Sequence, residues 1–534
     1  VMINSNPETV STDFDASTRL YFEPLDPESV RSVIDVETRP GESLLPAVVA
    51  YGGQTPLNLA APLAEAGIEL LGSDLEAIDQ AEERTRFAAL LDRLGIPQPE
   101  GGMARSVEEA LTLADRIGYP VIVRPSFVIG GLAIDFCYSP DDLVRQLAAA
   151  TVVDPDRPVR IDRYLEGVEV DIDAVSDGER VLIPGLLEHV ERAGVHSGDS
   201  VGVFPPQTVS AWDQELIVTT MERIVLALGA KGLVNAQFIV RDDGVYLIEV
   251  NPRASRTVPF MSKVTGVPMV DLATRCMMGA RLADMGYASG LWCIARPEAE
   301  GGEPACSLDR FAEQFGLEPN APIKPVYRTI PERDFVSGTA VLPEPVLYAV
   351  KAPVFSFQKL SKVEPSLGPE MKSTGEILGI DRTFEAALYK AMVASGIIFK
   401  GDGKVLLSVK DEDKDEALRI AQGLHRNGRE IAATPGTAHV LRENGIPCEE
   451  VSKIQQGTPN ILDFIMGGRA SLMINTPGLT ETAESEAARI RRACIETGVP
   501  CVTSIDTAAA LIHALEVFRD PTQASCLRLE EYFA

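Results

Sequence analysis

The chain has 534 residues, of which 45% are hydrophobic and 24% charged, a composition typical of globular proteins with large buried cores. Its 49 basic and 78 acidic residues give a net charge of −29, which argues against nucleic acid or an anionic membrane as the main partner. No apolar run approaches the roughly 20 residues that span a bilayer. The eight scattered cysteines contain no CxxC pair and indicate a reducing, cytoplasmic compartment.

The first part of the chain predicts α/β structure. Residues 1–72 alternate strand-like and helix-like segments, and the opening VMINSNPETV reads as the end of a strand, so we expect this unit to be incomplete at its N-terminus. Residues 73–120 predict mainly helices. A strand, a glycine turn and a second strand follow in YPVIVRPSFVIGGLAIDFCYS, and residues 158–260 alternate strands and helices.

The second part divides into three segments. Residues 285–345 are rich in proline, glycine and glutamate and predict a linker or an irregular insertion. Residues 346–400 predict a helical connecting region. From 401 to 534 the strand–helix pattern restarts, which predicts a separate, doubly wound α/β domain.

The stretch VYLIEVNPRASRTVPF, residues 245–260, places polar groups at the end of an apolar strand. Glu249 sits inside the apolar run, and Asn251 and Arg253 follow it. A buried charge costs several kcal/mol unless it is paired or bound to a metal. Two explanations remain open from this stretch alone, a structural ion pair between glutamate and arginine, and a metal–phosphate site.

Three patches together favour a nucleotide site. RPSFVIGG, residues 124–131, predicts a strand that runs into a glycine flap whose N–H groups can approach phosphates. In residues 162–174 a backbone edge flanked by apolar residues suits adenine, and Glu169 suits the ribose hydroxyls. Oxygens of Gln237, Glu249 and Asn251 on the next hairpin would make a magnesium site completed by phosphate and water.

A zinc site is the alternative for the histidines of this region. His189 and His196 lie near Glu188 and Asp199. Their segment is rich in glycine and β-branched residues and predicts strand and loop, which does not place both histidines on one helix face. We therefore favour the nucleotide site.

Six segments in this order resemble the carbamoyl phosphate synthetase large-subunit family, within the ATP-grasp fold. The segments are NSNPETVSTDFDASTRLYFEPL, YGGQTPLNLA, RPSFVIGG, EHVERAGVHSGDS, IEVNPRASRTVPFMSKVTGVP and LGPEMKSTGEILGI. The resemblance covers residues 1–285 and 346–534, and it is to the second, carbamate-phosphorylating half of the subunit. It implies a pre-ATP-grasp unit at 1–72, an ATP-grasp domain at 73–284, and a methylglyoxal-synthase-like regulatory domain with a parallel sheet at 401–534.

The resemblance also implies roles for single residues. The implied Mg²⁺ or Mn²⁺ ligands are Gln237, Glu249 and Asn251. The implied catalytic residues are Asn251, Arg253 and Arg256, with the two arginines facing the transferred phosphoryl group and the carbamate. The implied nucleotide-binding residues are Arg84, Arg124, Arg163, Leu165, Glu169, Gly194, Val195, His196 and Ser197. The implied phosphate pocket of the regulatory domain consists of Lys414, Thr434, Thr437, Lys453 and Asn475.

By this resemblance the chain uses ATP, Mg²⁺ or Mn²⁺, and K⁺, and phosphorylates carbamate. Its implied partners are a first synthetase half, a glutaminase small subunit, a nucleoside monophosphate effector and a second copy of itself. The alternatives are a non-catalytic regulatory or assembly subunit that binds nucleotide, and another ATP-grasp ligase or a biotin-dependent carboxylase. EHVERAGVHSGDS and the C-terminal domain disfavour the last two.

The sequence departs from the family pattern at three places. Leu132 stands where the family usually has an arginine after the flap glycines, and Pro477 stands where it often has a threonine. Residues 290–345 have no identifiable family counterpart. A first synthetase half does not precede this segment in the sequence, so the chain is expected to be a fragment, a subunit of a split enzyme, or a divergent relative.

Overall fold

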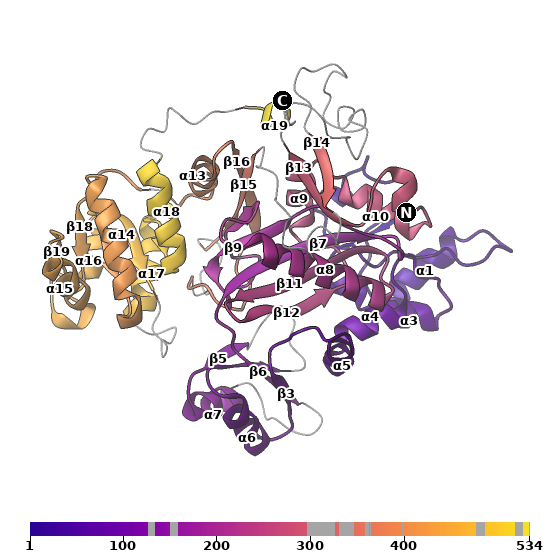
Figure 1. Cartoon of the computed structure of the whole chain (residues 1–534), viewed down its shortest axis with the longest axis horizontal. Coiled ribbons are helices and arrows are strands. Elements are labelled where there is room, and N and C mark those ends of the chain that lie inside the picture. Colours follow the sequence, from indigo (N-terminus) through magenta and orange to yellow (C-terminus); the bar gives the residue numbers. More distant parts are fainter. Residues whose placement is uncertain are drawn as a thin grey trace.

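The structure is a computed structural model. It describes residues 1–125, 134–149, 158–295, 326–330, 347–357, 363, 365–397, 399–476, 486–517 and 527–532. Figure 1 shows a central body on a large sheet, an N-terminal helical unit beside it, a small subdomain around β3, β5 and β6, and a C-terminal domain on the other side. Among the described residues, no helix is both long and apolar enough to cross a bilayer.

The N-terminal unit consists of two short parallel strands and a group of helices packed on a small apolar core. Its first helix begins after Asp26, because the Asp26 carboxylate accepts from the Ser29 N–H and Pro27 suits the first helical position. The elements are β1 (Met2–Ile3), β2 (Leu20–Tyr21), α1 (Pro27–Glu37), α2 (Gln54–Leu57), α3 (Ala60–Glu65) and α4 (Leu75–Glu82). The next helix, α5 (Arg84–Leu94), packs Phe87, Leu90 and Leu91 in the apolar cluster of the large sheet.

The small subdomain is a four-stranded antiparallel sheet, in the order β3-β6-β4-β5, with two helices packed on it. Its elements are β3 (Gly101–Ala104), α6 (Val107–Ile117), β4 (Val121–Pro125), β5 (Asp135–Cys137), α7 (Pro140–Ala149) and β6 (Val159–Arg163). The region 73–120 is therefore mainly helical, as predicted, but β3 interrupts it.

The large sheet has ten strands in the main order β14-β13-β8-β7-β9-β10-β15-β16, and β11, paired with β12, adds to β7. The strands are β7 (Val168–Ser176), β8 (Val181–Ile183), β9 (Leu186–Arg192), β10 (Gly202–Phe204), β11 (Gly232–Arg241), β12 (Gly244–Asn251), β13 (Gly290–Ala295), β14 (Val326–Ile330), β15 (Tyr348–Val354) and β16 (Gly375–Asp381). Alternate residues such as Ile172 and Phe238 pack with α8 (Ala211–Leu228) in one apolar cluster. The helices α9 (Val258–Thr265) and α10 (Met269–Met277) pack with other strand residues in a second cluster.

Two predictions about the middle of the chain are wrong. The apolar run GLWCIA and residues 326–330, both inside the expected linker 285–345, form β13 and β14 of the large sheet, because composition averaged over the segment hides short strands. Within the expected helical region 346–400, β15 and β16 are strands, and α13 (Phe384–Ala394) is the one helix among its described residues. Alanines in β15 favour helix, but pairing with β10 and β16 overrides that preference.

The C-terminal domain confirms the predicted doubly wound parallel sheet, with the order β19-β18-β17-β20-β21. Its strands are β17 (Lys404–Ser408), β18 (Ile431–Ala433), β19 (Glu449–Glu450), β20 (Ala470–Asn475) and β21 (Cys501–Val502). Its helices are α14 (Lys414–Arg426), α15 (Pro435–Glu443), α16 (Ile461–Met466), α17 (Glu486–Thr497) and α18 (Ile505–Val517). Helix α18 packs on α13, so one apolar cluster continues from this domain into the central body.

The prediction that the C-terminal domain extends to residue 534 is also wrong. The last helix, α19 (Leu529–Tyr532), lies beside the central body in Figure 1 rather than on the C-terminal domain. Tyr532 is buried in the same apolar cluster as Trp292 and Leu347, and Lys390 Nζ donates to its hydroxyl at 2.8 Å. The short apolar end of the chain therefore completes the core of another domain, which a local sequence pattern does not reveal.

Candidate functional site

The candidate site begins on the polar face of three neighbouring strands, β7, β11 and β12. Every second residue of β7 and β11 points away from the apolar cluster under α8, and on these positions the chain carries carboxylates and amides. The register sets these groups side by side in two rows across the strands. The rows are Asp171–Gln237–Glu249 and Asp173–Asn235–Asn251.

Glu249 reaches this face because β12 contains one extra residue. Leu247 lies in the apolar cluster, and simple alternation along the strand would bury Glu249 there too. Instead, Phe238 pairs with Leu247 while the next residue back, Gln237, pairs with Glu249, so that Ile248 is additional. This β-bulge turns the end of β12 over and aims its polar residues at the site.

The three residues predicted to bind metal are brought together. Gln237 and Glu249 are directly paired across the hairpin. Asn251 Nδ2 donates to Glu249 Oε1 at 3.0 Å, and Arg253 Nη2 donates to Asn251 Oδ1 at 3.4 Å. Asn235 Nδ2 anchors the row behind them through Asp173 Oδ1 at 3.0 Å.

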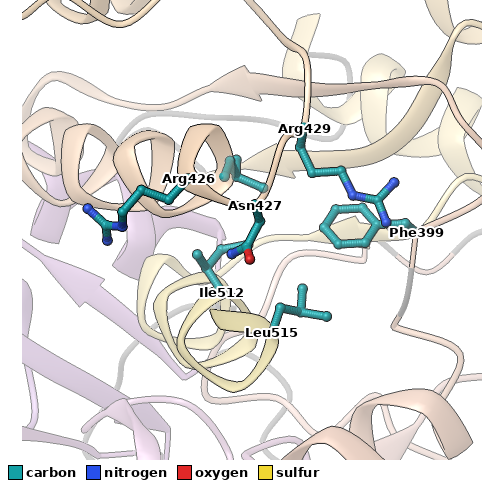
Figure 2. A pocket seen from close by; sticks show the side chains of 7 residues that line it. Phe399, Arg426, Asn427, Arg429, Ile512 and Leu515 are labelled. Atoms are coloured by element: carbon teal, nitrogen blue, oxygen red, sulfur yellow. The ribbon is translucent and has the colours of Figure 1, made fainter. Parts of the chain in front are cut away.

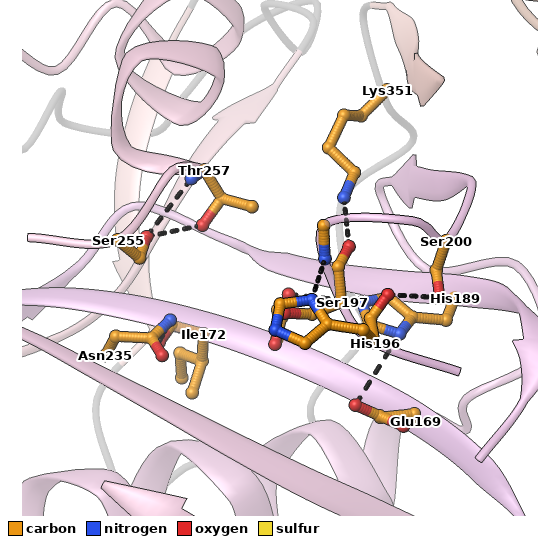
Figure 3. Close-up of polar contacts among 12 residues, drawn as sticks. Glu169, Ile172, His189, His196, Ser197, Ser200, Asn235, Ser255, Thr257 and Lys351 are labelled. Carbon is orange, nitrogen blue, oxygen red and sulfur yellow. Dashed lines mark hydrogen bonds and ion pairs between the residues drawn. The ribbon is translucent and has the colours of Figure 1, made fainter. Parts of the chain in front are cut away.

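A buried charge network around Asp171 adjoins Gln237 across the strands, and Figure 3 shows its members Glu169 and His189. His189 Nε2 lies 3.1 Å from Asp171 Oδ2, and its Nδ1 lies 3.8 Å from Glu169 Oε1. Burial, with the Asp171 carboxylate nearby, raises the pKa of Glu169 to about 7, although His189 opposes the rise. Burial lowers the pKa of His189, but the Asp171 carboxylate outweighs it and the net change is upward.

Lys351 of β15 binds the backbone of the predicted nucleotide loop. Its side chain is fully buried, and Nζ donates to the Ser197 carbonyl at 2.6 Å (Figure 3). The sequence reasoning missed this lysine. A charged residue inside the apolar run YAVKAPV is the same signal that singled out Glu249 in VYLIEVN, so the sequence could have pointed to Lys351.

The loop between β9 and β10 carries four predicted nucleotide-binding residues, Gly194, Val195, His196 and Ser197. The Gly198 N–H donates to His196 Nδ1 at 3.0 Å, so that nitrogen is an acceptor. Burial lowers the pKa of His196, which keeps its ring neutral near pH 7. The loop therefore presents backbone groups and a neutral imidazole beside the carboxylate rows.

The segment LGPEMKST holds this loop and Arg256 in place. The Lys372 and Ser373 N–H groups each donate to the buried Asp199 carboxylate at 2.8 Å. Arg256 Nη1 lies 3.3 Å from Ser373 Oγ and 2.9 Å from Met371 Sδ. The resemblance included this segment but assigned no role to it. In the structure its residues hold Asp199 and Arg256.

A group of arginines comes from α5 and the small subdomain. Arg160 Nε lies 2.7 Å from Asp162 Oδ1, and Arg124 Nε lies 4.0 Å from Asp162 Oδ2. Surrounding protein and the nearby Arg124 guanidinium lower the pKa of Arg84. Arg163, at the end of β6, is exposed. Sequence reasoning named three of these arginines and missed Arg160, which alternates with Asp162 along β6.

A small apolar cluster separate from the main cores adjoins the site. It consists of Leu165, Ala193 and Ile239, with Tyr246 and Ile248 packed against them. The bulge residue Ile248 thus has a place in this cluster. An apolar surface beside Glu169 and the 194–197 loop suits a flat base such as adenine.

The residues present fit a metal–triphosphate group. Two buried guanidinium nitrogens, Arg124 Nε and Arg253 Nε, have no hydrogen-bond partner among the described residues, which suits an anion. Carboxylate and amide oxygens are ligands that Mg²⁺ accepts. Among the described residues, no group of three or more His, Cys, Asp or Glu side chains could hold a metal, and the predicted ligand set contains the amides of Gln237 and Asn251.

Two sequence predictions lie outside the described residues. These are the glycine flap at 126–131, with Ser126, and Leu132 beyond it.

Three family models match the chain. They are the carbamoyl phosphate synthase preATP-grasp domain over residues 1–80, the carbamoyl-phosphate synthase L chain ATP-binding domain over 83–285, and the MGS-like domain over 416–503. A carbamoyl phosphate synthase large chain of Thermomicrobium roseum is 47% identical over 517 residues. The chain is a homologue of carbamoyl phosphate synthase large chains. The match covers 96% of this chain but 43% of the relative, so the chain spans less than half of that protein's length.

Solved structures with a related fold include biotin carboxylases. A biotin carboxylase–β,γ-ATP complex from Campylobacter jejuni has a TM-score of 0.41 at 18% identity, over 48% of this chain and 58% of that one. The biotin carboxylase subunit of pyruvate carboxylase has a TM-score of 0.43 at 17% identity, over 74% and 84%. These similarities are too low to carry an argument about function.

In the C-terminal domain, the predicted effector residues gather at the carboxyl ends of the parallel strands. Ser408 ends β17 and pairs in register with Asn475, which ends β20. Asn475 Nδ2 donates to the Ser408 carbonyl at 3.0 Å, and the buried Thr434 directly precedes α15. Ligands of doubly wound sheets bind at this edge.

Thr437 and Lys414 are two groups at this edge whose chemistry suits an anion. The Thr437 hydroxyl is buried and has no hydrogen-bond partner among the described residues. Lys414 Nζ lies 2.5 Å from Asp411 Oδ1, and a Cβ placed on Gly436 would come within 3.3 Å of that nitrogen. Lys453 is exposed nearby, where its charge lowers the pKa of Asp411 after the larger effect of Lys414.

Arg491 of α17 is a further member that the sequence reasoning missed. Its side chain is almost fully buried, and Nη1 donates to Asn475 Oδ1 at 2.8 Å. This contact fixes the orientation of the Asn475 amide. Pro477, the predicted departure from the family pattern, lies outside the described residues.

A separate pocket of about 210 Å³ opens between α14 and α18 (Figure 2). Phe399, Arg426, Arg429 and Ile512 are among its lining residues. It contains no residue predicted from sequence, and the Arg429 guanidinium stacks on the Phe399 ring at 4.1 Å.

Proposed function

We propose that this chain phosphorylates carbamate with ATP to form carbamoyl phosphate, as the second synthetase half of a glutamine-hydrolysing carbamoyl phosphate synthase. The observation that carries the proposal is the grouping of Gln237, Glu249 and Asn251 on one sheet face beside Arg253. Homology to carbamoyl phosphate synthase large chains supports it, and 96% of the chain takes part in that match.

In this proposal the site works by positioning and by charge. Mg²⁺ held by Gln237, Glu249 and Asn251 would neutralise the phosphate oxygens. Arg253 and Arg256 donate hydrogen bonds to the transferred phosphoryl group and to the carbamate, so no covalent enzyme intermediate is required. Glu169 accepts from the ribose hydroxyls, and the apolar cluster around Ile239 contacts the base.

The arginines of the small subdomain complete the phosphate contacts. Arg84 lies on α5 and Arg124 on β4, and the Arg124 Nε atom has no hydrogen-bond partner among the described residues. A phosphate oxygen would satisfy this buried donor. In this proposal the nucleotide lies between the small subdomain and the large sheet.

Further parts of the proposal concern ions and partners. We propose that the chain can use Mn²⁺ in place of Mg²⁺ and that it binds K⁺ as a second ion. Its proposed protein partners are a first synthetase half that supplies carbamate and a glutaminase small subunit. A nucleoside monophosphate is the proposed effector at Lys414, Thr434, Thr437, Lys453 and Asn475. A cytoplasmic location and a homo-oligomer are also included.

The decisive experiment runs the half reaction backwards. The purified chain, mixed with carbamoyl phosphate and MgADP, should form ATP, and it should show no glutamine-dependent synthesis by itself. The Glu249→Gln variant supplies the background rate. Binding of nucleotide without any ATP formation would instead favour the alternative, a non-catalytic subunit that binds nucleotide.

A further inference from the structure

We propose that Arg192 is a positioning residue through which the regulatory domain sets the conformation of the nucleotide loop 193–198. The proposal rests on the proposed function for what the two sites bind. Arg192 is the last residue of β9 and directly precedes the loop. It is not one of the residues assigned to either site.

Arg192 connects two helices of the regulatory domain to the large sheet. Its Nε lies 3.2 Å from Asp506 Oδ1, and its backbone N–H donates to Asp506 Oδ2 at 3.3 Å. Its Nη2 lies 3.4 Å from Glu416 Oε1, and its Nη1 lies 3.6 Å from Glu166 Oε1. Asp506 belongs to α18 and Glu416 to α14, so one guanidinium holds both helices.

The neighbouring residue makes a second attachment to the same helix. Glu191 is buried, and its carboxylate accepts from the Thr507 hydroxyl of α18. The other carboxylate oxygen accepts from the Val201 N–H at 2.7 Å, at the far end of the loop. Through Glu191, the regulatory domain is therefore linked to both ends of the segment that contains the nucleotide loop.

The loop cannot move independently of these anchors. The Ala193 N–H donates to the Gly167 carbonyl at 3.2 Å, and the Ala193 carbonyl accepts from Tyr164 at 2.7 Å. Gly194 to Ser197 follow at once, and the Ser197 carbonyl is held by Lys351. A shift of β9 at Arg192 is thus passed to the backbone groups that face the nucleotide.

On the regulatory side, the effector lysine and the Arg192 contact share one helical turn. Lys414 is the first residue of α14, and Glu416 lies two positions later. Lys414 is paired with Asp411, and an effector phosphate would compete for the same ammonium group. Recruiting Lys414 to a phosphate would move the first turn of α14 and alter the distance from Glu416 to Arg192.

The attachment of α14 and α18 to β9 depends on the positive charge of Arg192. Three carboxylates, from Glu166, Glu416 and Asp506, surround its single guanidinium, and the acidic groups around it raise the pKa of Arg192 against the effect of burial. The arginine side chain is 43% exposed, so its contribution to stability is small. Its removal leaves like charges facing each other across the domain boundary, which weakens the attachment of α14 and α18 to β9.

The test compares full-length wild type with Arg192→Met and Arg192→Lys, using uridine monophosphate as the probe. The KM for MgADP in ATP formation from carbamoyl phosphate is measured with and without the probe, and the Kd of the probe by calorimetry. For Arg192→Met we expect the ratio of the two KM values to fall toward one, a loss of about fivefold or more in coupling. The probe Kd should stay within about twofold, as for an independent site.

Two controls separate positioning from general damage. Arg281→Met removes an exposed arginine paired with Glu179, within the central body, and should leave the KM ratio unchanged. Arg192→Lys keeps the charge without the planar fork and should retain part of the coupling.

Hydrogen exchange of the peptide that covers 193–198, measured without ligand, supplies a readout that needs no activity. Exchange in Arg192→Met should be about tenfold faster than in wild type. An unchanged exchange rate overturns the proposal, as does an unchanged KM ratio with intact probe binding. A wild-type chain that forms no ATP contradicts the proposed function instead, and the exchange rate then decides the role of Arg192.

Discussion

Glu169 and His189 are buried opposite each other on β7 and β9, with 3.8 Å between the Glu169 Oε1 and His189 Nδ1 atoms. Burial raises the pKa of Glu169 from 4.5 to about 7. A group whose pKa is higher in the folded chain stabilises the fold fully below its unfolded pKa and loses this effect as the pH rises through the folded value. We therefore expect the Glu169 contribution to unfolding free energy to decline between about pH 4.5 and pH 7.

The size of this decline is measurable. Because one pKa unit corresponds to about 1.4 kcal/mol, the difference amounts to roughly 3 kcal/mol. Urea unfolding at several pH values should show a flatter profile for Glu169→Gln than for wild type. Glu65→Gln, at an exposed position, is the control and should keep the wild-type profile. Equal slopes in all three proteins would show that Glu169 has an ordinary pKa.

Glu249→Gln tests the metal assignment. The substitution keeps the shape of the side chain and its bond with Asn251, but it removes one negative charge from the proposed Mg²⁺ site. ATP formation from carbamoyl phosphate and MgADP should fall about 100-fold or more. The melting temperature should change little, because Glu249 is not part of an apolar core. Near-normal turnover at saturating Mg²⁺ would exclude Glu249 as a ligand.

Much of this site could be predicted because the chain places polar residues where an apolar strand makes them costly. Glu249 and Asn251 stood out for that reason, Gln237 followed from the hairpin that pairs with them, and the family resemblance then implied the same three residues. The bulge at Ile248 could not be predicted, since it depends on the register of β12 against β11 and not on the strand's own pattern. Simple alternation would have put Glu249 in the core.

Contacts between distant segments were the other part that sequence could not supply. Lys351 and Ser197 are 154 positions apart, and their bond exists because β15 pairs with β10. The strand character of β15 itself was missed: its two alanines favour helix, whereas Tyr348, Val350 and Val354 favour a strand once a partner strand is present. Arg160, by contrast, lies two positions from Asp162 on the same strand, so this pair could have been read from VRIDR.

Tyr532 should anchor the end of the chain to the central body. Its ring is buried among residues of β13, β15 and α9, and its hydroxyl accepts from Lys390. Tyr532→Ala should lower the unfolding free energy of the central body by about 3 kcal/mol or more, and Tyr532→Phe by about 1 kcal/mol. Tyr138→Ala, at an exposed ring, is the matched control. Equal effects of the two alanine variants in denaturant unfolding would contradict the packing of α19.

Lys453 should contribute to effector binding through its charge. It is exposed at the edge that carries Thr434 and Asn475, and a charge-assisted bond to phosphate is worth about 1.5–3 kcal/mol. Lys453→Ala should therefore weaken binding of uridine or inosine monophosphate by about tenfold or more in calorimetry, with activity in the absence of effector nearly unchanged. Unaltered affinity for both nucleotides would remove Lys453 from the pocket.

Thr437 allows the sharpest test of the effector pocket, because its buried hydroxyl has no partner among the described residues. Such a group costs stability, so the isosteric change Thr437→Val should leave the melting temperature unchanged or raise it. Effector binding should nevertheless weaken about tenfold, since a bound phosphate loses a donor. Ser471→Ala is the matched control, because the Ser471 hydroxyl is equally buried and unpartnered among the described residues but lies near the opposite end of β20. That variant should gain stability in the same way and bind the effector as wild type does. If Thr437→Val also bound uridine and inosine monophosphates with wild-type affinity, the hydroxyl would be a packing defect and not part of the pocket.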